Sequence, residues 1–180
     1  MKISRAFSKF GIAACLLSFA SSLALADTWR LKDYEEEFKF KSGIRILQIT
    51  RARENLPFHL KIYNGNQLLA DYPGFSFDYF AESPDDKLIV GLSNSGLANT
   101  AIAVFDHYGS LQALALHGIE SFDYCEMSIT VRRQWYDEKN PNVRFDGAFG
   151  SDNGIRKITV RNCHGEQVRL FDVIEKSYRN

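Results

Sequence analysis

The chain has 180 residues, 22 basic and 22 acidic side chains and therefore no formal net charge. A chain of this length fits one domain of ordinary size. The basic residues are dispersed, so the composition argues against a nucleic-acid binder and against polybasic attachment to anionic lipid.

Residues 1–26 have the pattern of a secretory signal peptide. Three basic residues come first: Lys2, Arg5 and Lys9. An uncharged, mostly apolar run follows over 10–26 and closes with Ala24-Leu25-Ala26, the small-x-small pattern that signal peptidase accepts. The run is shorter than the roughly 20 apolar residues that a membrane span needs. We therefore expect cleavage after Ala26 and no membrane span.

Cleavage would leave one domain, residues 27–180, in the periplasm or outside the cell. The predicted signal holds three of the 22 basic residues and no acidic one, so 22 − 3 = 19 basic residues would face 22 acidic ones. An alternative is a lipoprotein signal that ends at Cys15. Most of the hydrophobic segment follows Cys15, which is the reverse of the order in lipoprotein signals.

The chain after the signal predicts β-strands almost throughout. Polar and apolar residues alternate over 36–41 and again over 44–50, with Ser42-Gly43 as a turn between them. A strand over 60–63 runs into Asn64-Gly65, a strong hairpin signal because both turn residues tolerate a positive φ.

The returning strand begins at Leu68 and breaks at Tyr72-Pro73-Gly74. Aromatic residues alternate with smaller ones over 75–80, which predicts another strand. Residues 111–119 fit a short helix or a strand, and their alternation after the turn at 108–110 favours a strand. We expect little helix anywhere.

A weak internal repeat indicates the architecture. Residues 102–109 and 158–165 share one pattern, which is a strand of period two followed by a polar turn that ends in glycine. Residues 60–65 form a shortened copy. The turn glycines Gly65, Gly109 and Gly165 are 44 and 56 residues apart, near the length of a β-propeller blade.

Residues 83–91 and 101–106 contain a more specific form of this pattern. Ser83-Pro84-Asp85-Asp86-Lys87 is a turn, a strand and a loop follow, and the next strand ends at Asp106. Over about 75–115 the chain resembles a blade of the TolB-like propellers, although Asp86 stands where that pattern prefers glycine. The resemblance implies an all-β fold, a partial, open β-propeller-like stack of antiparallel hairpins. A β-sandwich of the same strands is the alternative.

Two cysteines remain after removal of the signal, Cys125 and Cys163. An even number in an oxidising compartment favours a disulfide between them, with two free thiols as the alternative.

No reaction can be read from the remaining residues. The four histidines, His59, His107, His117 and His164, show no metal-ligand spacing, and His107 and His164 occupy equivalent turn positions in the repeat. No nucleophile motif is present, and the adjacent carboxylates favour solvated edges. We expect a protein that is not an enzyme and has no metal or cofactor. A hydrolase whose carboxylates meet only in space is the remaining alternative.

Two loops are candidates for recognition. Residues 93–100 are small and polar and lie between two strong strands, with Ser93, Asn94, Ser95, Asn99 and Thr100 as candidate contacts. Trp135 and Tyr136 precede a second polar loop and are candidate aromatic anchors. The alternative is that these two rings simply cover the sheet.

The signal, the size, the β-rich pattern, the paired cysteines and the loop 93–95 together resemble the exported immunity proteins that neutralise type VI secreted peptidoglycan amidases. That resemblance implies a partner protein, such as a secreted toxin or an envelope protein, and a loop at Ser93-Asn94-Ser95 that plugs its catalytic cleft. The alternative is a small-ligand or glycan-binding domain that uses Tyr79, Trp135 and Tyr136 as stacking platforms.

Overall fold

The structure is a computed structural model that describes residues 31–118, 122–128, 132–146 and 154–178. The predicted signal peptide and its cleavage site lie outside these residues. No helix in the described ranges is long and apolar enough to cross a membrane.

The first sheet is a four-stranded antiparallel meander in the order β1-β2-β3-β4. Its strands are β1 (Tyr34–Lys39), β2 (Ile44–Thr50), β3 (Phe58–Asn64) and β4 (Gln67–Pro73). The predicted strand over 44–50 coincides with β2, and its residues alternate between buried and half-buried. Both predicted turns form, and Gly43 has φ 86°. The hairpin turn is shifted by one residue, because Asn64 ends β3 and pairs with Gln67, which leaves Gly65 (φ 56°) and Asn66 as the turn residues.

The second sheet repeats this meander in the order β5-β6-β7-β8. Its strands are β5 (Tyr79–Glu82), β6 (Leu88–Leu92), β7 (Thr100–Asp106) and β8 (Leu111–Leu116). Strand β8 confirms the strand expected from residue 111 onward. The strand predicted over 75–80 is wrong in its first four residues, because residues 75–78 form the connection between the two sheets.

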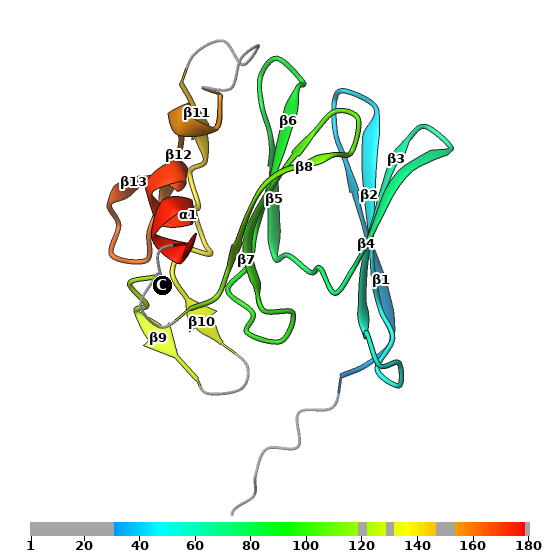
Figure 1. Cartoon of the computed structure of the whole chain (residues 1–180), viewed down its shortest axis with the longest axis horizontal. Coiled ribbons are helices and arrows are strands. Elements are labelled where there is room, and N and C mark those ends of the chain that lie inside the picture. Colours follow the sequence, from blue (N-terminus) through cyan, green and yellow to red (C-terminus); the bar gives the residue numbers. More distant parts are fainter. Residues whose placement is uncertain (1–30, 119–121, 129–131, 147–153, 179–180) are drawn as a thin grey trace, which may run out of the picture. The chain divides into compact units, whose positions relative to one another are not determined.

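The described residues after β8 form short strands, a 3-10 helix and an α-helix beside the second sheet (Figure 1). These are β9 (Glu126–Met127), β10 (Arg133–Gln134), β11 (Arg144–Phe145), the 3-10 helix η1 (Ile155–Lys157), β12 (Ile158–Arg161), β13 (Gln167–Arg169) and α1 (Leu170–Tyr178). Strands β9 and β10 pair with each other, and β11, β12 and β13 form a three-stranded antiparallel sheet. We call the elements from β9 to α1 the third layer.

Two hydrophobic cores join these layers, one on each side of the second sheet. One core contains Ile46 and Ile62 of the first sheet together with Ile89 and Phe105 of the second. The other core contains Val90 and Val104 of the second sheet and packs them against the third layer, whose contributions include Trp135, Tyr136, Ile158, Val160 and Leu170. The second sheet is therefore the middle layer.

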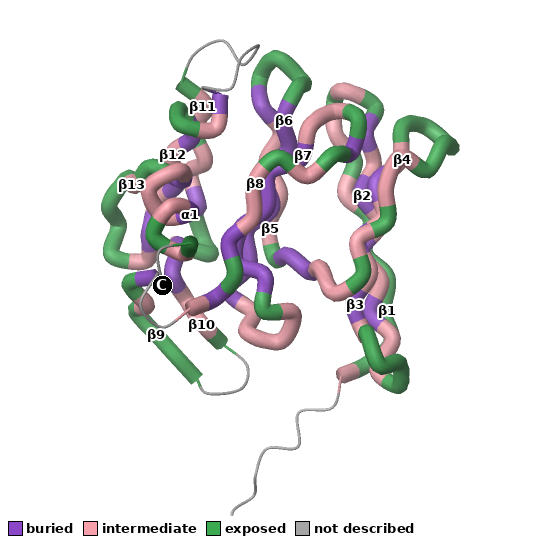
Figure 2. The backbone as a smooth tube through the Cα atoms, viewed as in Figure 1, coloured by how far each residue is buried: buried purple, intermediate pink, exposed green. Residues whose placement is uncertain are grey.

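The position of each sheet follows from its sequence pattern. A sheet that is covered on one face alternates in polarity, as β2 does. All five residues of β6 are buried, as are the first six of β7, which is the continuous apolar pattern of strands covered on both faces. Figure 2 shows this burial concentrated along the middle sheet.

The predicted repeat has a structural counterpart in two matching turns. The side-chain oxygen of Asp106 accepts hydrogen bonds from the N–H groups of Tyr108 (2.9 Å) and Ser110 (2.8 Å). The side-chain oxygen of Asn162 accepts them in the same way from His164 (3.1 Å) and Glu166 (2.8 Å). Each turn ends in a glycine of positive φ, 80° at Gly109 and 87° at Gly165.

The fold class is therefore all-β, as predicted. Antiparallel meanders stack face to face, and the sheets of the described residues do not close into a barrel. One short helix, α1, completes the third layer. This helix was not predicted, and its apolar residues Leu170, Val173 and Ile174 repeat at helical spacing.

Candidate functional site

The predicted recognition loop is partly internal. Ser93 has none of its surface exposed, Asn94 has 2% and Thr100 has 2%. Only residues 95–99 reach the solvent, and Asn99 is the most exposed of them. The loop connects β6 to β7 at the end of the sheet opposite the Ser83–Lys87 turn (Figure 1).

Asn94 connects the middle sheet to the third layer. Its side-chain oxygen accepts hydrogen bonds from the N–H groups of Trp135 (2.9 Å) and Tyr136 (3.4 Å). Its amide group donates to the carbonyl of Tyr136 (3.3 Å) and to the carboxylate of Glu138 (3.1 Å). All four bonds serve the fold, so the Asn94 side chain is not free to contact a partner in this conformation.

Trp135 and Tyr136 are core residues, with 2% and 1% of their surface exposed. The indole N–H of Trp135 donates to the carbonyl of Ser93 (2.8 Å), which satisfies its polar atom within the core. Their prediction as exposed anchors is therefore corrected in favour of the alternative that they cover the sheet. Residues of the following loop, such as Asp137 and Lys139, remain nearer the surface.

The exposed part of the loop is held by Arg133. Its guanidinium donates to the side chain of Asn99 (3.3 Å) and to the carbonyl of His117 (3.3 Å). A Cβ atom on Gly96 would lie 3.2 Å from Nε of Arg133, so the loop backbone passes close over this side chain. Asn99 adopts φ 56°, a conformation that asparagine tolerates better than most residues.

Two carboxylates lie at the base of the loop. Asp78 accepts hydrogen bonds from the N–H of Asn94 (2.7 Å) and the hydroxyl of Ser93 (3.3 Å). Burial of its carboxyl group raises the pKa of Asp78, although the residue retains exposed surface and these bonds act in the opposite direction. Glu138 accepts from Asn94 and, at 3.0 Å, from Arg132. The contacts of both carboxylates hold the loop in place.

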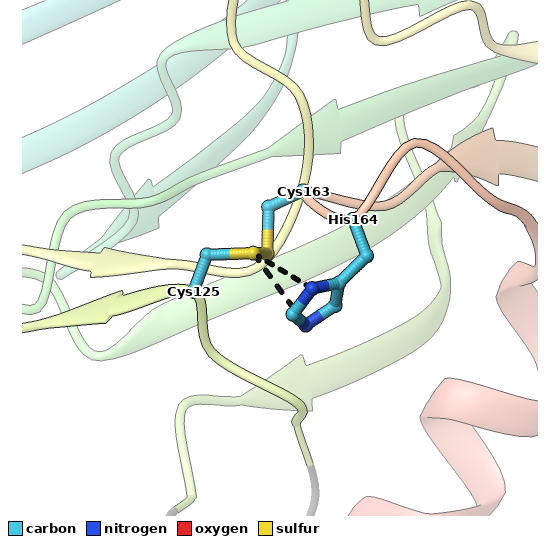
Figure 3. Close-up of side chains that lie close together, drawn as sticks. All are labelled: Cys125, Cys163 and His164. Carbon is cyan, nitrogen blue, oxygen red and sulfur yellow. Dashed lines mark hydrogen bonds between the residues drawn. A yellow bond between two sulfur atoms is a disulfide. The ribbon is translucent and has the colours of Figure 1, made fainter.

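The cysteines form a disulfide, as predicted, with 6.0 Å between their Cα atoms. The bond joins the segment before β9 to the turn between β12 and β13. The imidazole ring of His164 lies beside it, with both ring nitrogens 3.5 Å from Sγ of Cys125 (Figure 3). Nε2 of His164 is also 3.2 Å from a carboxylate oxygen of Asp123.

A pocket of about 370 Å³ lies close to this group, between β13, α1 and the segment around Phe122. Its lining combines apolar side chains with charged and amide groups: Phe122, Asp123, Trp135, Asn162, Gln167, Val168, Arg169, Asp172, Val173 and Lys176. Arg169 and Asp172 pair across 2.9 Å. Asp123 belongs both to the pocket and to the His164 group.

Comparison with known proteins assigns no family. No family model matches the chain, and no curated protein or solved structure matches it either. The site therefore has to be interpreted from its own residues.

The other candidates from the sequence have structural contacts. Glu37 pairs with Lys39 (2.8 Å) and Arg45 (2.7 Å) on the first sheet, and Glu35 pairs with Arg51. These ion pairs agree with the interpretation of adjacent carboxylates as solvated edges. In its turn, the ring of His107 lies with its centroid 3.7 Å from that of Tyr108, at an interplanar angle of 43°.

Sequence reasoning missed the grouping of Cys125, Cys163 and His164. Asp123 and Cys125 are two residues apart, and Cys163 and His164 are adjacent. A disulfide that joins the cysteines necessarily brings Asp123 and His164 near each other. The expected bridge was thus a usable signal for this cluster.

Proposed function

We propose that this protein is exported to the periplasm or the extracellular space and binds another protein there. Residues 95–99 form the contact, and the protein acts as an inhibitor or immunity factor against a cell-wall-degrading effector. The role of the buried Ser93 and Asn94 is to support the loop. The proposed contact with the partner is therefore residues 95–99, a shorter segment than the loop 93–100 predicted from the sequence.

The clamped loop is the observation that carries the proposal. A loop that is already ordered loses little conformational entropy when it binds, so more of the contact energy appears as affinity. Asn94 holds the base of the loop with four hydrogen bonds, and Arg133 supports its tip. Small side chains at Ser95, Gly96 and Ala98 allow the backbone to approach a partner closely.

The signal pattern and the resemblance to exported immunity proteins supply the class of partner. Both come from the sequence and are independent of the loop geometry. Export can be tested separately by mass spectrometry of the protein from the cell envelope, for which we expect a chain that begins at Asp27.

The binding test uses two matched substitutions, Leu97→Glu and Leu68→Glu. Leu97 is half-buried at the tip of the loop, whereas Leu68 is 49% exposed on β4 of the first sheet. Wild-type protein and each variant would be used to capture partners from the native envelope and from secreted fractions. Each captured protein would then be purified, and its affinity would be measured by titration calorimetry.

We expect Leu97→Glu to weaken binding of the captured partner by at least about 30-fold, because loss of a hot-spot contact costs about 2 kcal/mol or more. Leu68→Glu should bind like the wild type. The captured protein should degrade peptidoglycan, and the wild-type protein should inhibit it. Equal affinity of both variants, or a partner whose activity is unchanged by binding, would contradict the proposal.

The pocket supports a second candidate, binding of a small ligand. Its volume lies in the range of known ligand pockets, and Trp135 and Phe122 lie among charged and amide groups that suit a zwitterionic peptide or a glycan fragment. Titration with soluble muropeptides, followed by tryptophan fluorescence, tests this candidate. A saturable change that Lys176→Gln weakens would favour it over the loop.

A further inference from the structure

Three potential metal ligands lie together at the surface beside the pocket. Cys125 and His164 are exposed and Cys163 is half-buried. One donor atom from each of the three side chains lies within 4.8 Å of the other two. Figure 3 shows the imidazole ring beside the two bonded sulfur atoms.

The spacing between sulfur and nitrogen fits tetrahedral coordination. Zinc binds sulfur at about 2.3 Å and imidazole nitrogen at about 2.0–2.1 Å, so two such ligands at a tetrahedral angle are about 3.5 Å apart. The observed distance from Sγ of Cys125 to Nδ1 of His164 is 3.5 Å. The two sulfur atoms, which are bonded to each other, would have to separate. The imidazole ring, whose two nitrogens are both 3.5 Å from Sγ of Cys125, would also have to turn so that Nδ1 points toward the ion.

Two neighbours hold His164 beside the sulfur atoms. The backbone N–H of His164 donates to the side chain of Asn162 (3.1 Å), which holds the turn. Asp123 lies 3.2 Å from Nε2 and can accept a hydrogen bond from the N–H at that atom, which leaves Nδ1 without a proton and able to bind a metal ion. A carboxylate that accepts the second N–H of a ligand histidine is the common arrangement around protein-bound zinc.

We propose that reduction of the disulfide converts Cys125, Cys163 and His164 into a binding site for one Zn²⁺ ion. Asp123 is a positioning residue for His164, and the fourth coordination position is open to water. This inference is independent of the proposed binding loop.

The conversion has two balanced steps. A dithiol reductant breaks the sulfur–sulfur bond by thiol–disulfide exchange, so that Cys125 and Cys163 become thiols and the reductant becomes a cyclic disulfide. Zinc then binds the two sulfur atoms as thiolates and Nδ1 as neutral imidazole, and both thiol protons pass to the solvent. The exposed position of Cys125 gives the reductant and the ion access from the solvent.

Either state links the same two segments of the third layer. The disulfide joins residue 125 to residue 163, and the bound ion would join the same residues through its ligands. The zinc site therefore preserves this connection under reducing conditions.

The test uses the purified protein reduced with a phosphine. One water molecule supplies the oxygen of the phosphine oxide and the protons of the two thiols. Zn²⁺ would be titrated in competition with a chromophoric chelator, and Co²⁺ would report the ligand set by its absorption. We expect one ion per chain, thiolate-to-cobalt charge transfer, and release of about two protons per zinc near pH 7, where free thiols are mostly protonated. The oxidised protein should bind neither ion at this site.

His164→Ala and His107→Ala form a matched pair, because both histidines occupy equivalent turns of the repeat. We expect His164→Ala to weaken zinc binding by more than about 100-fold and Asp123→Asn by about 10-fold, since loss of an outer partner costs 10–100-fold. His107→Ala should bind like the wild type. Melting of the oxidised forms shows whether each variant is folded. Absence of zinc binding by the reduced wild type, or equal affinity of His164→Ala, would overturn the proposal.

Discussion

Single polar residues hold the layers of this protein in register. Asn94 joins the middle sheet to the third layer, and Gln48 does the same between the first sheet and the connection at Phe77. Gln48 accepts from the N–H of Phe77 (2.8 Å) and donates to its carbonyl (3.1 Å) while only 2% exposed. Both side chains take the place of a neighbouring strand, because each forms hydrogen bonds with backbone N–H and C=O groups that have no partner in a strand.

The contacts of Asn94 predict a large effect of Asn94→Ala on stability. The substitution leaves the buried N–H of Trp135 and the carbonyl of Tyr136 without their partner, at about 1–3 kcal/mol for each unsatisfied group. We expect the free energy of unfolding to fall by about 2–4 kcal/mol in a urea titration. Asn66→Ala, at an exposed turn of the first sheet, is the control and should change it by less than about 0.5 kcal/mol.

His117 predicts a pH dependence of stability. Burial, and then the charge of Arg133, lower the pKa of His117 from 6.5 to about 4. The unfolded state therefore binds a proton below pH 6.5 that the folded state takes up only near pH 4. The contribution of His117 to the free energy of unfolding is fully present above pH 6.5. It is lost as the pH falls from 6.5 to 4, which lowers that free energy by roughly 3 kcal/mol.

Urea titrations at several pH values between 4 and 7 measure the slope of the free energy of unfolding against pH. His117→Phe, which keeps an aromatic ring beside Phe122 and Tyr124, should flatten the slope in this window. His107→Phe is the matched control and should retain it. A slope that is unchanged in His117→Phe would show that another group titrates.

At the scale of elements, close packing of the connection at 75–78 determines which residues β6 tolerates. A Cβ atom on Gly91 would lie 2.9–3.1 Å from the ring of Phe77, which is buried between the first and second sheets. Phe77 cannot move away easily, because the side chain of Gln48 forms hydrogen bonds with both the N–H and the carbonyl of Phe77. Glycine is therefore required here for space.

Gly91→Ala is expected to destabilise the protein by about 1–3 kcal/mol through overpacking. If the ring of Phe77 is the cause, Phe77→Leu should reduce the cost of Gly91→Ala when the two substitutions are combined. A double-mutant cycle from thermal or urea unfolding measures this coupling. Strict additivity of the two effects would place the clash elsewhere.

The whole molecule depends on contacts between layers that are distant in sequence. The third layer has only short strands, and its disulfide supplements their pairing. In the chain-entropy account, a bridge over 38 residues stabilises the folded protein by about 4 kcal/mol.

The outer face of the first sheet carries ion pairs and the guanidinium of Arg45 above the ring of Tyr63 (4.3 Å), which suit a solvated surface.

We therefore expect reduction to lower the melting temperature by about 10 °C when a chelator keeps metal ions away. Calorimetry of the oxidised and reduced protein measures this shift. Cys125→Ser combined with Cys163→Ser should melt like the reduced form. An unchanged transition in the reduced protein would show that the bridge does not contribute to stability.

Local signals predicted much of the first two sheets. The alternation over 44–50 and the Asn64-Gly65 turn identify a strand and a hairpin because both depend on neighbouring residues. The same reasoning failed at 75–78, where alternating aromatics pack between two sheets without joining either. It also missed α1, whose apolar positions Leu170, Val173 and Ile174 span little more than one helical turn.

Sequence by itself determined the strand-rich composition and the repeated turns, since both follow from short-range patterns. It also favoured a bridge between Cys125 and Cys163, which the structure contains. Tertiary structure alone decided which candidate residues face the solvent. Trp135 and Tyr136 have the composition of exposed anchors, yet the third layer places them against the middle sheet. Burial depends on which layers meet, and that depends on contacts between residues far apart in the chain.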